Sequence, residues 1–281
     1  TWLKTLDERL ALEITESIIH LSNFYFYFGK YAKSLDLAEL SQKLKQKVLD
    51  IKSDARNARP LARTRVGMGK AYWKLGNFYD AILSFLRSIE YLIIANTYNN
   101  DEEGYMVGRC FCLLGEVYLD LNSLDLAEDF LKSSLNIMEK RSQLVDNHLY
   151  VGIANNVLGR ILARKGKVEL DSAKAESLFS DARDRLYEAK YYLSETFKDA
   201  PFHRYRANNL CNIAMRDWYC FYRLTEPEVR FSPSKITEFD NVVAKFKDEI
   251  EHREKCFDRA NKYHSSKANA HINLAKVYLL S

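Results

Sequence analysis

The sequence contains few of the residues that interrupt regular secondary structure. Only 4 prolines and 10 glycines occur in 281 residues, whereas apolar residues make up 47% and charged residues 28%. A β-sandwich or a barrel needs many tight turns, and tight turns rely on glycine and proline. The composition therefore favours long helices joined by short polar turns, with enough apolar side chain for a continuous core.

Long apolar runs are also absent, since no stretch approaches the roughly 18 consecutive apolar residues that a membrane-spanning helix requires. The beginning of the chain lacks the basic-then-apolar pattern of a secretory signal. The first residue is Thr1 rather than Met, and the sequence closes on the apolar run 277–280. We therefore expect the chain to be a fragment of a longer protein.

Cysteine occurs without a paired spacing, at the five positions 110, 112, 211, 220 and 256. Cys110 and Cys112 would point about 200° apart on a helix, so they could not share a metal ion there. We interpret the five cysteines as buried thiols of a reducing cytoplasm. The net charge of +4 is mild and does not by itself indicate nucleic-acid binding.

Motifs that indicate enzymes are missing as well. The sequence has no glycine-rich phosphate loop, no His-Glu-x-x-His and no Cys-x2-Cys pair. The strongest metal candidate is His252 with Cys256, four residues apart on one predicted helix, and it lacks a third and a fourth ligand. We therefore predict no catalytic residue, no metal site and no cofactor, and we expect the chain not to be an enzyme.

An internal repeat is the main positive signal. The two clear copies are Met68-Gly69-x2-Tyr72 followed by Ala81-x3-Phe85-x2-Ser88, and Phe111-x2-Leu114-Gly115-x2-Tyr118 followed by Ala127-x3-Leu131-x2-Ser134. The interval from Gly to Ala is 12 residues in both copies. Large residues at intervals of three and four form an apolar stripe on a helix, and the small residue marks the place where the neighbouring helix comes closest. Each copy is therefore predicted to be a helix hairpin.

The predicted turns and three fainter copies extend this pattern. Gly76 and Asn122 lie just past the end of a predicted helix, where both residue types are common. Fainter copies are Ile18-x2-Leu21-Ser22-x2-Tyr25, Leu158-Gly159-x2-Leu162 with Gly166 at the predicted turn and Ala175-x3-Phe179-x2-Ala182 after it, and the segment 208–211. Near the end of the chain the pattern of a hairpin's first helix occurs once more, in His271-x2-Leu274-Ala275-x2-Tyr278.

These residues resemble the tetratricopeptide repeat family, whose signature is Trp-x2-Leu-Gly-x2-Tyr followed by Ala-x3-Phe. The signature Trp is replaced by Arg65, Phe111 and Asn155 in the three copies with the Gly, and those glycines lie 46 and 44 residues apart rather than about 34. The chain therefore resembles long-helix variants such as those of kinesin light chain, the polarity adaptor LGN/Pins and STAND-type regulators. This resemblance implies a right-handed superhelix whose concave face is lined by first helices.

The predicted fold is thus an all-α, right-handed solenoid of about five helix hairpins plus a final helix, in a single repeat domain over residues 1–281. The expected hairpins are 7–57, 59–98, 103–143, 146–197 and 200–263, and the final helix is 265–281. Pro60 and Pro201 are predicted to open helices. The segment 225–234, with two prolines, is expected to be a loop before a charged helix over 236–263, either a surface connection or a functional appendage.

The first-helix face supplies the candidate binding residues. The predicted partner-binding residues are Arg63, Lys70, Trp73, Lys74, Arg109, Asn156, Arg160, Arg164, Arg206 and Asn209. Arginine can grip a carboxylate through two hydrogen bonds, and an asparagine amide can both donate to and accept from a peptide backbone. The resemblance supports Asn156 and Asn209 as backbone clamps. We therefore expect a scaffold that binds an acidic or carboxylate-ended peptide, although these charges could merely solvate the face.

Two alternative functions remain open on sequence grounds, and so do two interpretations of one aromatic segment. The chain could be the ligand-sensing module of a larger regulator, with an effector domain outside this sequence. Nucleic-acid binding through the basic stretch 56–74 ranks third, because acidic residues lie near it. The aromatic run 24–28 surrounds its helix completely, so some of its rings must meet a preceding segment, which we favour, or a ligand.

Overall fold

The computed structural model describes residues 8–48, 58–95, 101–139, 145–200, 203–225, 232–256 and 265–280. Within these residues the chain is all-helical, and it divides into two compact units, residues 1–141 and 142–281. Unit 1 contains α1 (Glu8–Tyr27), α2 (Tyr31–Val48), α3 (Ala58–Lys74), α4 (Phe78–Ile94), α5 (Asp101–Asp120) and α6 (Leu124–Glu139). Unit 2 contains α7 (Val145–Val168), α8 (Ser172–Thr196), α9 (Arg204–Leu224), α10 (Pro233–Cys256) and α11 (Ser265–Leu280).

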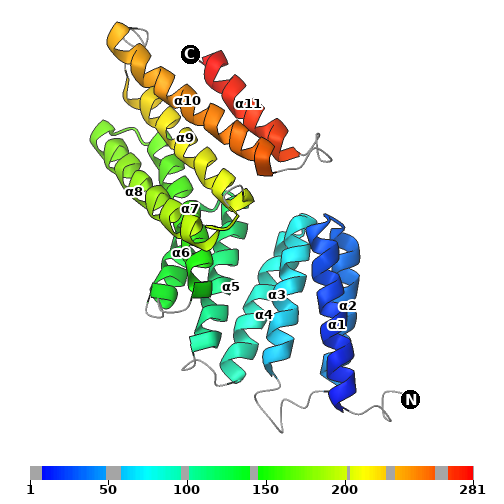
Figure 1. Cartoon of the computed structure of the whole chain (residues 1–281). Coiled ribbons are helices and arrows are strands. Elements are labelled where there is room, and N and C mark those ends of the chain that lie inside the picture. Colours follow the sequence, from blue (N-terminus) through cyan, green and yellow to red (C-terminus); the bar gives the residue numbers. More distant parts are fainter. Residues whose placement is uncertain are drawn as a thin grey trace. The chain divides into compact units, whose positions relative to one another are not determined.

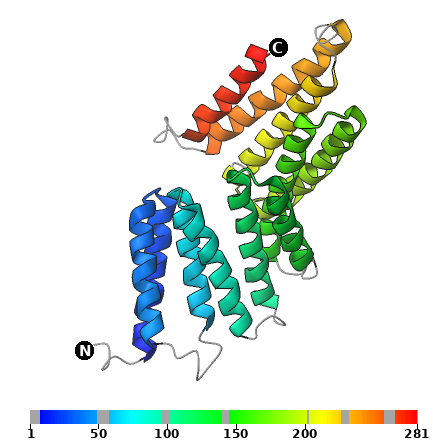
Figure 2. The same cartoon turned by 180° about the vertical axis from the view of Figure 1, so that it is seen from behind.

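The helices pair in chain order into five hairpins, and α11 follows as a final helix (Figure 1). In unit 1, α2 packs against α3 and α4 packs against α5, so the three hairpins lie side by side in both views (Figures 1 and 2). The predicted fold class, an all-α stack of about five hairpins plus a last helix, is confirmed. That the whole chain acts as one domain stays a prediction.

Glycine sets the close approach of the helices in the second and third hairpins. A Cβ atom on Gly69 would lie 2.6 Å from the ring of Phe85, and one on Gly115 would lie 2.6 Å from Cγ of Leu131. Real Cβ atoms do not approach their neighbours this closely, so an alanine would force the helices apart. The predicted role of Gly69 and Gly115 is confirmed.

The turns of these two hairpins use residues with positive φ. Gly76 has a φ of 80° and Asn122 a φ of 59°, which places both in the left-handed region that ends many helices. Asn77 then caps α4, because its side-chain oxygen accepts a hydrogen bond from the Asp80 amide at 3.3 Å. The predicted turn residues Gly76 and Asn122 thus end the first helix of each hairpin, and the second helix begins shortly after them.

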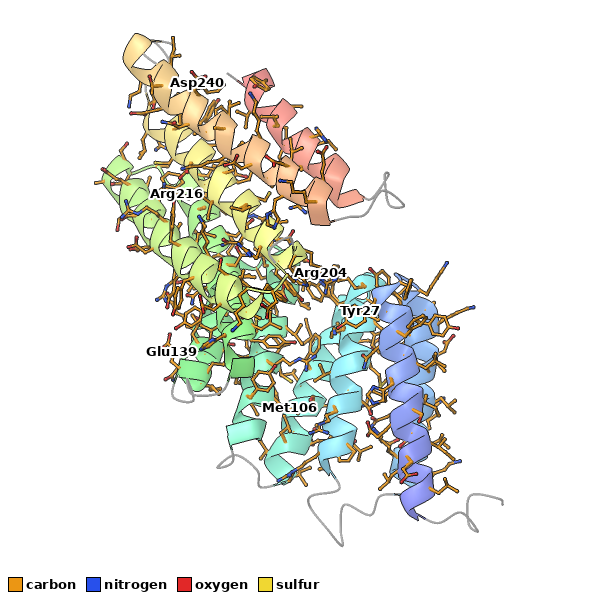
Figure 3. All side chains as sticks on the ribbon, viewed as in Figure 1. Tyr27, Met106, Glu139, Arg204, Arg216 and Asp240 are labelled. Carbon is orange, nitrogen blue, oxygen red and sulfur yellow. The ribbon has the colours of Figure 1, made fainter. Side chains whose placement is uncertain are left out.

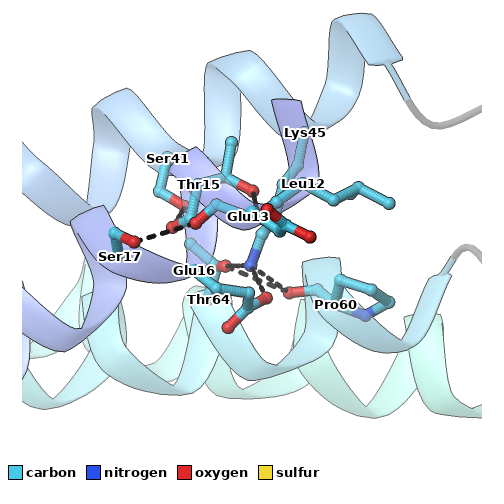
Figure 4. A network of polar contacts seen from close by, with 9 residues as sticks. All are labelled: Leu12, Glu13, Thr15, Glu16, Ser17, Ser41, Lys45, Pro60 and Thr64. Atoms are coloured by element: carbon cyan, nitrogen blue, oxygen red, sulfur yellow. Dashed lines mark hydrogen bonds and ion pairs between the residues drawn. The ribbon is translucent and has the colours of Figure 1, made fainter. Parts of the chain in front are cut away.

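The buried residue Lys45 connects the helices α1, α2 and α3 of unit 1 (Figure 4). The Lys45 ammonium on α2 donates to Glu16 Oε1 on α1 at 2.7 Å and to Thr64 Oγ1 on α3 at 3.1 Å. Its side chain is fully buried. Burial lowers the pKa of Lys45, while the hydrogen bond and charge of Glu16 act in the opposite direction. The network therefore ties the first hairpin to the second.

The fourth hairpin is longer and repeats the glycine contact three times. Cβ atoms on Gly152, Gly159 and Gly166 of α7 would lie 2.9 Å, 2.6 Å and 3.1 Å from side-chain atoms of Leu193, Leu186 and Phe179 of α8. Both sets of residues are spaced by seven, close to two helical turns. The same edge of α7 therefore faces the same edge of α8 along most of the hairpin.

The prediction that Gly166 forms the turn of the fourth hairpin was wrong. Gly166 lies inside α7, because it packs against Phe179 and the helix continues to Val168. The turn is formed by residues 169–171, after which Asp171 caps α8 by accepting a hydrogen bond from the Lys174 amide at 2.8 Å. Arg223 of α9 donates hydrogen bonds of 2.8 Å to the carbonyl oxygens of Glu169 and Leu170. This turn is thus held by a side chain from the next helix.

The last three helices share a core centred on Trp218 of α9, Phe246 of α10 and Val277 of α11. A buried ion pair joins Arg253 Nε to Glu249 Oε1 at 2.6 Å, and Arg253 also donates to Asn208 Oδ1 on α9. The charged helix predicted over 236–263 begins earlier, at Pro233, because Pro is favourable in a first helical turn. Pro201 and most of the predicted loop, residues 226–231, lie outside the described residues, as do residues 257–264.

Candidate functional site

Three of the predicted binding residues of unit 1 lie together on α3, and two of them contact the first helices on either side. The Lys70 ammonium lies 4.7 Å from the ring centroid of Phe26 on α1. Trp73 Nε1 donates a 2.9 Å hydrogen bond to Asp120 Oδ2 on α5, and Lys74 lies 3.8 Å from the Trp73 ring. The first helices α1, α3 and α5 thus share a face, as the repeat register predicts.

The other two predicted residues of unit 1, Arg63 and Arg109, lie in different surroundings. Arg63 is exposed on α3, and its charge contributes to lowering the pKa of Lys45. Arg109 is half-buried on α5 beside two buried thiols. Burial raises the pKa of Cys110 to about 11, and the Arg109 charge opposes that change.

In unit 2 the two predicted asparagines meet each other. Asn209 Nδ2 on α9 donates to Asn156 Oδ1 on α7 at 3.1 Å and to the Leu186 carbonyl on α8 at 3.0 Å. Asn212 Nδ2 donates to the same Asn156 oxygen at 3.1 Å. Asn156 and Asn209 are buried, so these amides fix α9 against α7 and α8.

Next to this amide cluster lies a basic and phenolic cluster, which we call the α7–α9 basic face. It consists of Arg160, Arg164 and Lys167 on α7 and Asn212 and Tyr219 on α9. The Lys167 ammonium lies 4.7 Å from the centroid of the Tyr219 ring. Burial raises the pKa of the Tyr219 phenol, and the positive charges of Arg164 and Arg160 act in the opposite direction. The phenol is therefore protonated at neutral pH and can donate a hydrogen bond.

Arg206, the remaining predicted residue, lies on α9 near α10. Its charge contributes to lowering the pKa of His252, for which burial is the larger cause. The structure thus brings Arg160 and Arg164 together with the α9 phenol, and it places Arg206 toward a different neighbour.

Sequence reasoning missed Asn212, Lys167 and Tyr219. A signal was present, because Tyr219 follows Asn212 by seven residues and Lys167 follows Arg160 by seven. Residues seven apart return to nearly the same side of a helix. On sequence grounds the register of the fifth copy is ambiguous by one residue, so the spacing does not fix which residues of α9 face α7.

Solved structures with the same arrangement of helices exist. A putative kinesin light chain from Podospora anserina with nearly identical TPR-like repeats is 13% identical, with a TM-score of 0.51 over 87% of this chain and 97% of that one. The tetratricopeptide-like repeat fold is therefore the fold of this chain. Aspartyl phosphate phosphatase F from Bacillus subtilis is 16% identical to this repeat chain, with a TM-score of 0.54. That match covers 96% of this chain and 60% of the phosphatase. No protein-family profile and no curated protein sequence matches the chain.

The described residues of this tetratricopeptide-like chain contain no group of three or more His, Cys, Asp or Glu side chains arranged to hold a metal ion. The side chain of Cys256, half of the His252–Cys256 candidate, lies outside the described part. Likewise, none of the described helices is sufficiently long and apolar to span a lipid bilayer.

Proposed function

We propose that this chain is a non-enzymatic protein- or peptide-binding scaffold and that its first-helix faces recognise an acidic or carboxylate-ended segment. The fold supports the general role, since repeat stacks present extended surfaces to partners. The α7–α9 basic face carries the specific proposal, because the charges of two guanidinium groups act on one phenol there and an ammonium lies over its ring.

This face has the donors that a carboxylate needs. Arginine can donate two parallel hydrogen bonds to a carboxylate, and the Tyr219 hydroxyl can add a third donor. The half-buried positions of Arg160 and Arg164 reduce the screening by water that weakens exposed ion pairs. We assign Arg160 and Arg164 as the primary anion-binding residues.

The two predicted backbone clamps support the site indirectly in this proposal. Asn156 and Asn209 are engaged with each other and with the Leu186 carbonyl, and they hold α9 beside α7. Asn212 lies on the same side and can present its amide to the partner's backbone. In unit 1, the proposal includes Arg63, Lys70, Trp73, Lys74 and Arg109, and in unit 2 it includes Arg206.

The test begins with selection of peptides with free carboxyl termini from a random display library, using the purified chain as bait. The enriched peptides should be rich in Asp and Glu, and their affinities are then measured by fluorescence anisotropy. Arg164→Ala should weaken binding roughly tenfold to a hundredfold, because a hydrogen bond between charged groups contributes about 1.5–3 kcal/mol.

The matched control is Arg183→Ala, which removes the same charge from an exposed position on α8. It should bind the selected peptides like the unaltered chain. Peptides without an acidic preference would contradict the proposed specificity. Equal binding by Arg164→Ala and the unaltered chain would contradict the proposed site.

A second function, a sensor module of a larger regulator, is favoured by the division into two compact units. In that role, binding of a ligand changes the shape of the chain and so acts on an attached effector domain. Small-angle scattering with and without a selected peptide tests this. An unchanged radius of gyration would contradict it.

We also propose a cytoplasmic location. The support is the chemistry of the thiols, since Cys110 and Cys112 are free and buried and burial raises both pKa values.

A further inference from the structure

The outward side of α1 carries a row of exposed apolar side chains. The row, which we call the outer stripe of α1, consists of Leu10, Ile14, Ser17, Leu21 and Phe24 of α1 and of Phe28 in the turn that follows, where the Phe28 amide still donates to the Phe24 carbonyl at 3.2 Å. Its five apolar members are between 37% and 66% exposed. The opposite side of α1 is already occupied by α2, since Ser22 bonds to the Ser34 carbonyl and the Thr15 carbonyl accepts from Ser41.

The stripe has no charged member, and its one polar residue is satisfied within the helix. Ser17 Oγ donates to the Glu13 carbonyl at 2.9 Å, so a partner would not have to supply a hydrogen bond to it. The rings of Phe24 and Phe28 pack at a centroid distance of 4.6 Å and form one apolar surface. Tyr27, labelled in Figure 3, is also exposed at this end of α1.

The spacing of the stripe specifies the shape of its partner. Successive members are 4, 3, 4, 3 and 4 residues apart. Apolar residues that alternate between spacings of three and four form the seam of a coiled coil, in which another helix packs at a small crossing angle. An extended peptide or a flat surface would not match this seam, so the expected occupant is a helix.

The α4 helix provides a useful contrast. Its exposed residues Tyr79, Leu83, Leu86 and Ile93 have a similar spacing, but Glu90 falls at the position that would complete the row. Glu90 is paired with Arg87 on the same helix. A helix packed there would bury a charged pair, so α4 does not offer the continuous apolar seam that α1 offers.

The stripe is complementary to itself in the antiparallel direction. A second α1 centred on residue 19 would place Leu10 opposite Phe28, Ile14 opposite Phe24, and Ser17 opposite Leu21. Each layer then combines a smaller with a larger side chain, and no member is left over. Parallel pairing in register would instead stack Phe28 on Phe28 and Ser17 on Ser17, which makes the seam wide at one end and narrow in the middle.

We therefore propose that the outer stripe of α1 is a homodimerisation surface, in which α1 packs antiparallel against α1 of a second copy. The stripe spans about 27 Å. Six partly exposed side chains from each copy would bury on the order of 1,000 Å² in total, at the low end of specific interfaces. We expect a dissociation constant in the micromolar range and a two-fold symmetric, closed dimer.

The first experiment is sedimentation velocity of the purified 281-residue chain over a concentration series from about 1 to 200 μM. A concentration-dependent shift from monomer to dimer is expected. Leu21→Glu should abolish the shift, because it places charges near the dimer axis. Leu86→Glu, on α4, is the matched control and should dimerise like the unaltered chain.

Two further variants test the register. Ser17→Leu should tighten the dimer at least tenfold, because each copy gains a large apolar side chain at the seam. The double variant Ser17→Cys/Leu21→Cys should form a disulfide-linked dimer, whereas Ser17→Cys alone should not, since its two copies are offset along the axis.

Several outcomes would overturn the proposal. A chain that stays monomeric up to 200 μM, with Ser17→Leu included, would show that α1 does not pair with itself and that a helix of another segment or protein covers the stripe. Cross-linking through Ser17→Cys alone would indicate parallel pairing. A dimer lost on Leu86→Glu but kept on Leu21→Glu would move the interface to α4.

Discussion

In both the second and the fourth hairpin, glycines on the first helix allow the second helix to pack closely, although the helices differ in length. In the second hairpin, one glycine, Gly69, brings α3 against Phe85 of α4, and both helices have 17 residues. In the fourth, three glycines spaced by seven bring the 24-residue α7 against the 25-residue α8. A repeat can therefore lengthen by adding whole seven-residue steps, because such a step keeps the same side of each helix in contact.

The largest expected effect is at the middle contact of the fourth hairpin. Leu186→Ala should lower the free energy of unfolding by about 2–5 kcal/mol, because the fully buried side chain leaves a cavity between rigid helices. Leu131→Ala, at the corresponding contact of the third hairpin, is the comparison. Urea unfolding followed by circular dichroism measures both variants. A loss well below 1 kcal/mol in Leu186→Ala would show that the middle contact is not needed.

Glycine-to-alanine substitutions should have opposite signs at two kinds of position. Gly159→Ala should cost about 1–3 kcal/mol, because its Cβ would approach Leu186 and, at 3.0 Å, the backbone oxygen of Ala182. Gly67→Ala should stabilise by about 0.5–1 kcal/mol, since nothing lies within 4 Å and alanine favours a helix. Thermal unfolding of both variants is the measurement. Changes of the same sign would contradict the close-approach interpretation.

The turns provide the third contrast. Gly76→Ala should cost about 1–2 kcal/mol because a Cβ is strained at its φ of 80°. Arg223→Ala should cost a similar or smaller amount, about 1–2 kcal/mol, because the carbonyl oxygens of Glu169 and Leu170 lose their partner. Hydrogen exchange should show faster exchange at the α8 start only in Arg223→Ala. Unchanged exchange there would argue against a role for Arg223 in holding the turn.

The smallest expected effect concerns the connection from α8 to α9. His203 caps α9, and burial together with the charge of Arg204 lowers the pKa of His203 to about 4. Because the folded pKa lies below the unfolded value near 6.5, the unfolded state binds more protons between these values. The stabilisation is therefore complete above pH 6.5 and is lost as the pH falls toward 4.

His203 Nδ1 accepts a hydrogen bond from the Tyr205 amide at 3.3 Å, and His203→Asn replaces this nitrogen with an amide oxygen that can accept the same bond but does not titrate. Its stability should change less than that of the unaltered chain between pH 6.5 and 4, as measured by urea unfolding at a series of pH values. Parallel curves for the two proteins would contradict the assignment to His203.

Much of the fold could be predicted because its determinants are local. The spacing of the paired helices follows from the interval between Gly69 and Ala81. The helix ends follow from the turn residues Gly76 and Asn122. The fourth turn could not be predicted in the same way. It depends on Arg223, more than 50 residues away in sequence, and no local sequence pattern indicates that contact.

The candidate site was predicted less completely than the fold. The repeat register assigned Asn156 and Asn209 to the binding face as backbone clamps, but both residues are buried and Asn209 Nδ2 donates to Asn156 Oδ1. Whether a polar residue faces a partner or a neighbouring helix depends on how closely the helices pack, and spacing alone does not give that. The contact between Lys167 and Tyr219 depends on the packing of α9 beside α7, which the sequence alone does not specify.

The Lys45 network gives the first hairpin a built-in chemical reporter. Reagents that acylate lysine need a neutral and accessible amine, and the Lys45 ammonium is enclosed by groups from α1, α2 and α3. Acylation of this residue must therefore wait until the three helices separate. The rate at which Lys45 is labelled, relative to an exposed lysine such as Lys132, thus measures how often the end of unit 1 opens while the protein as a whole stays folded.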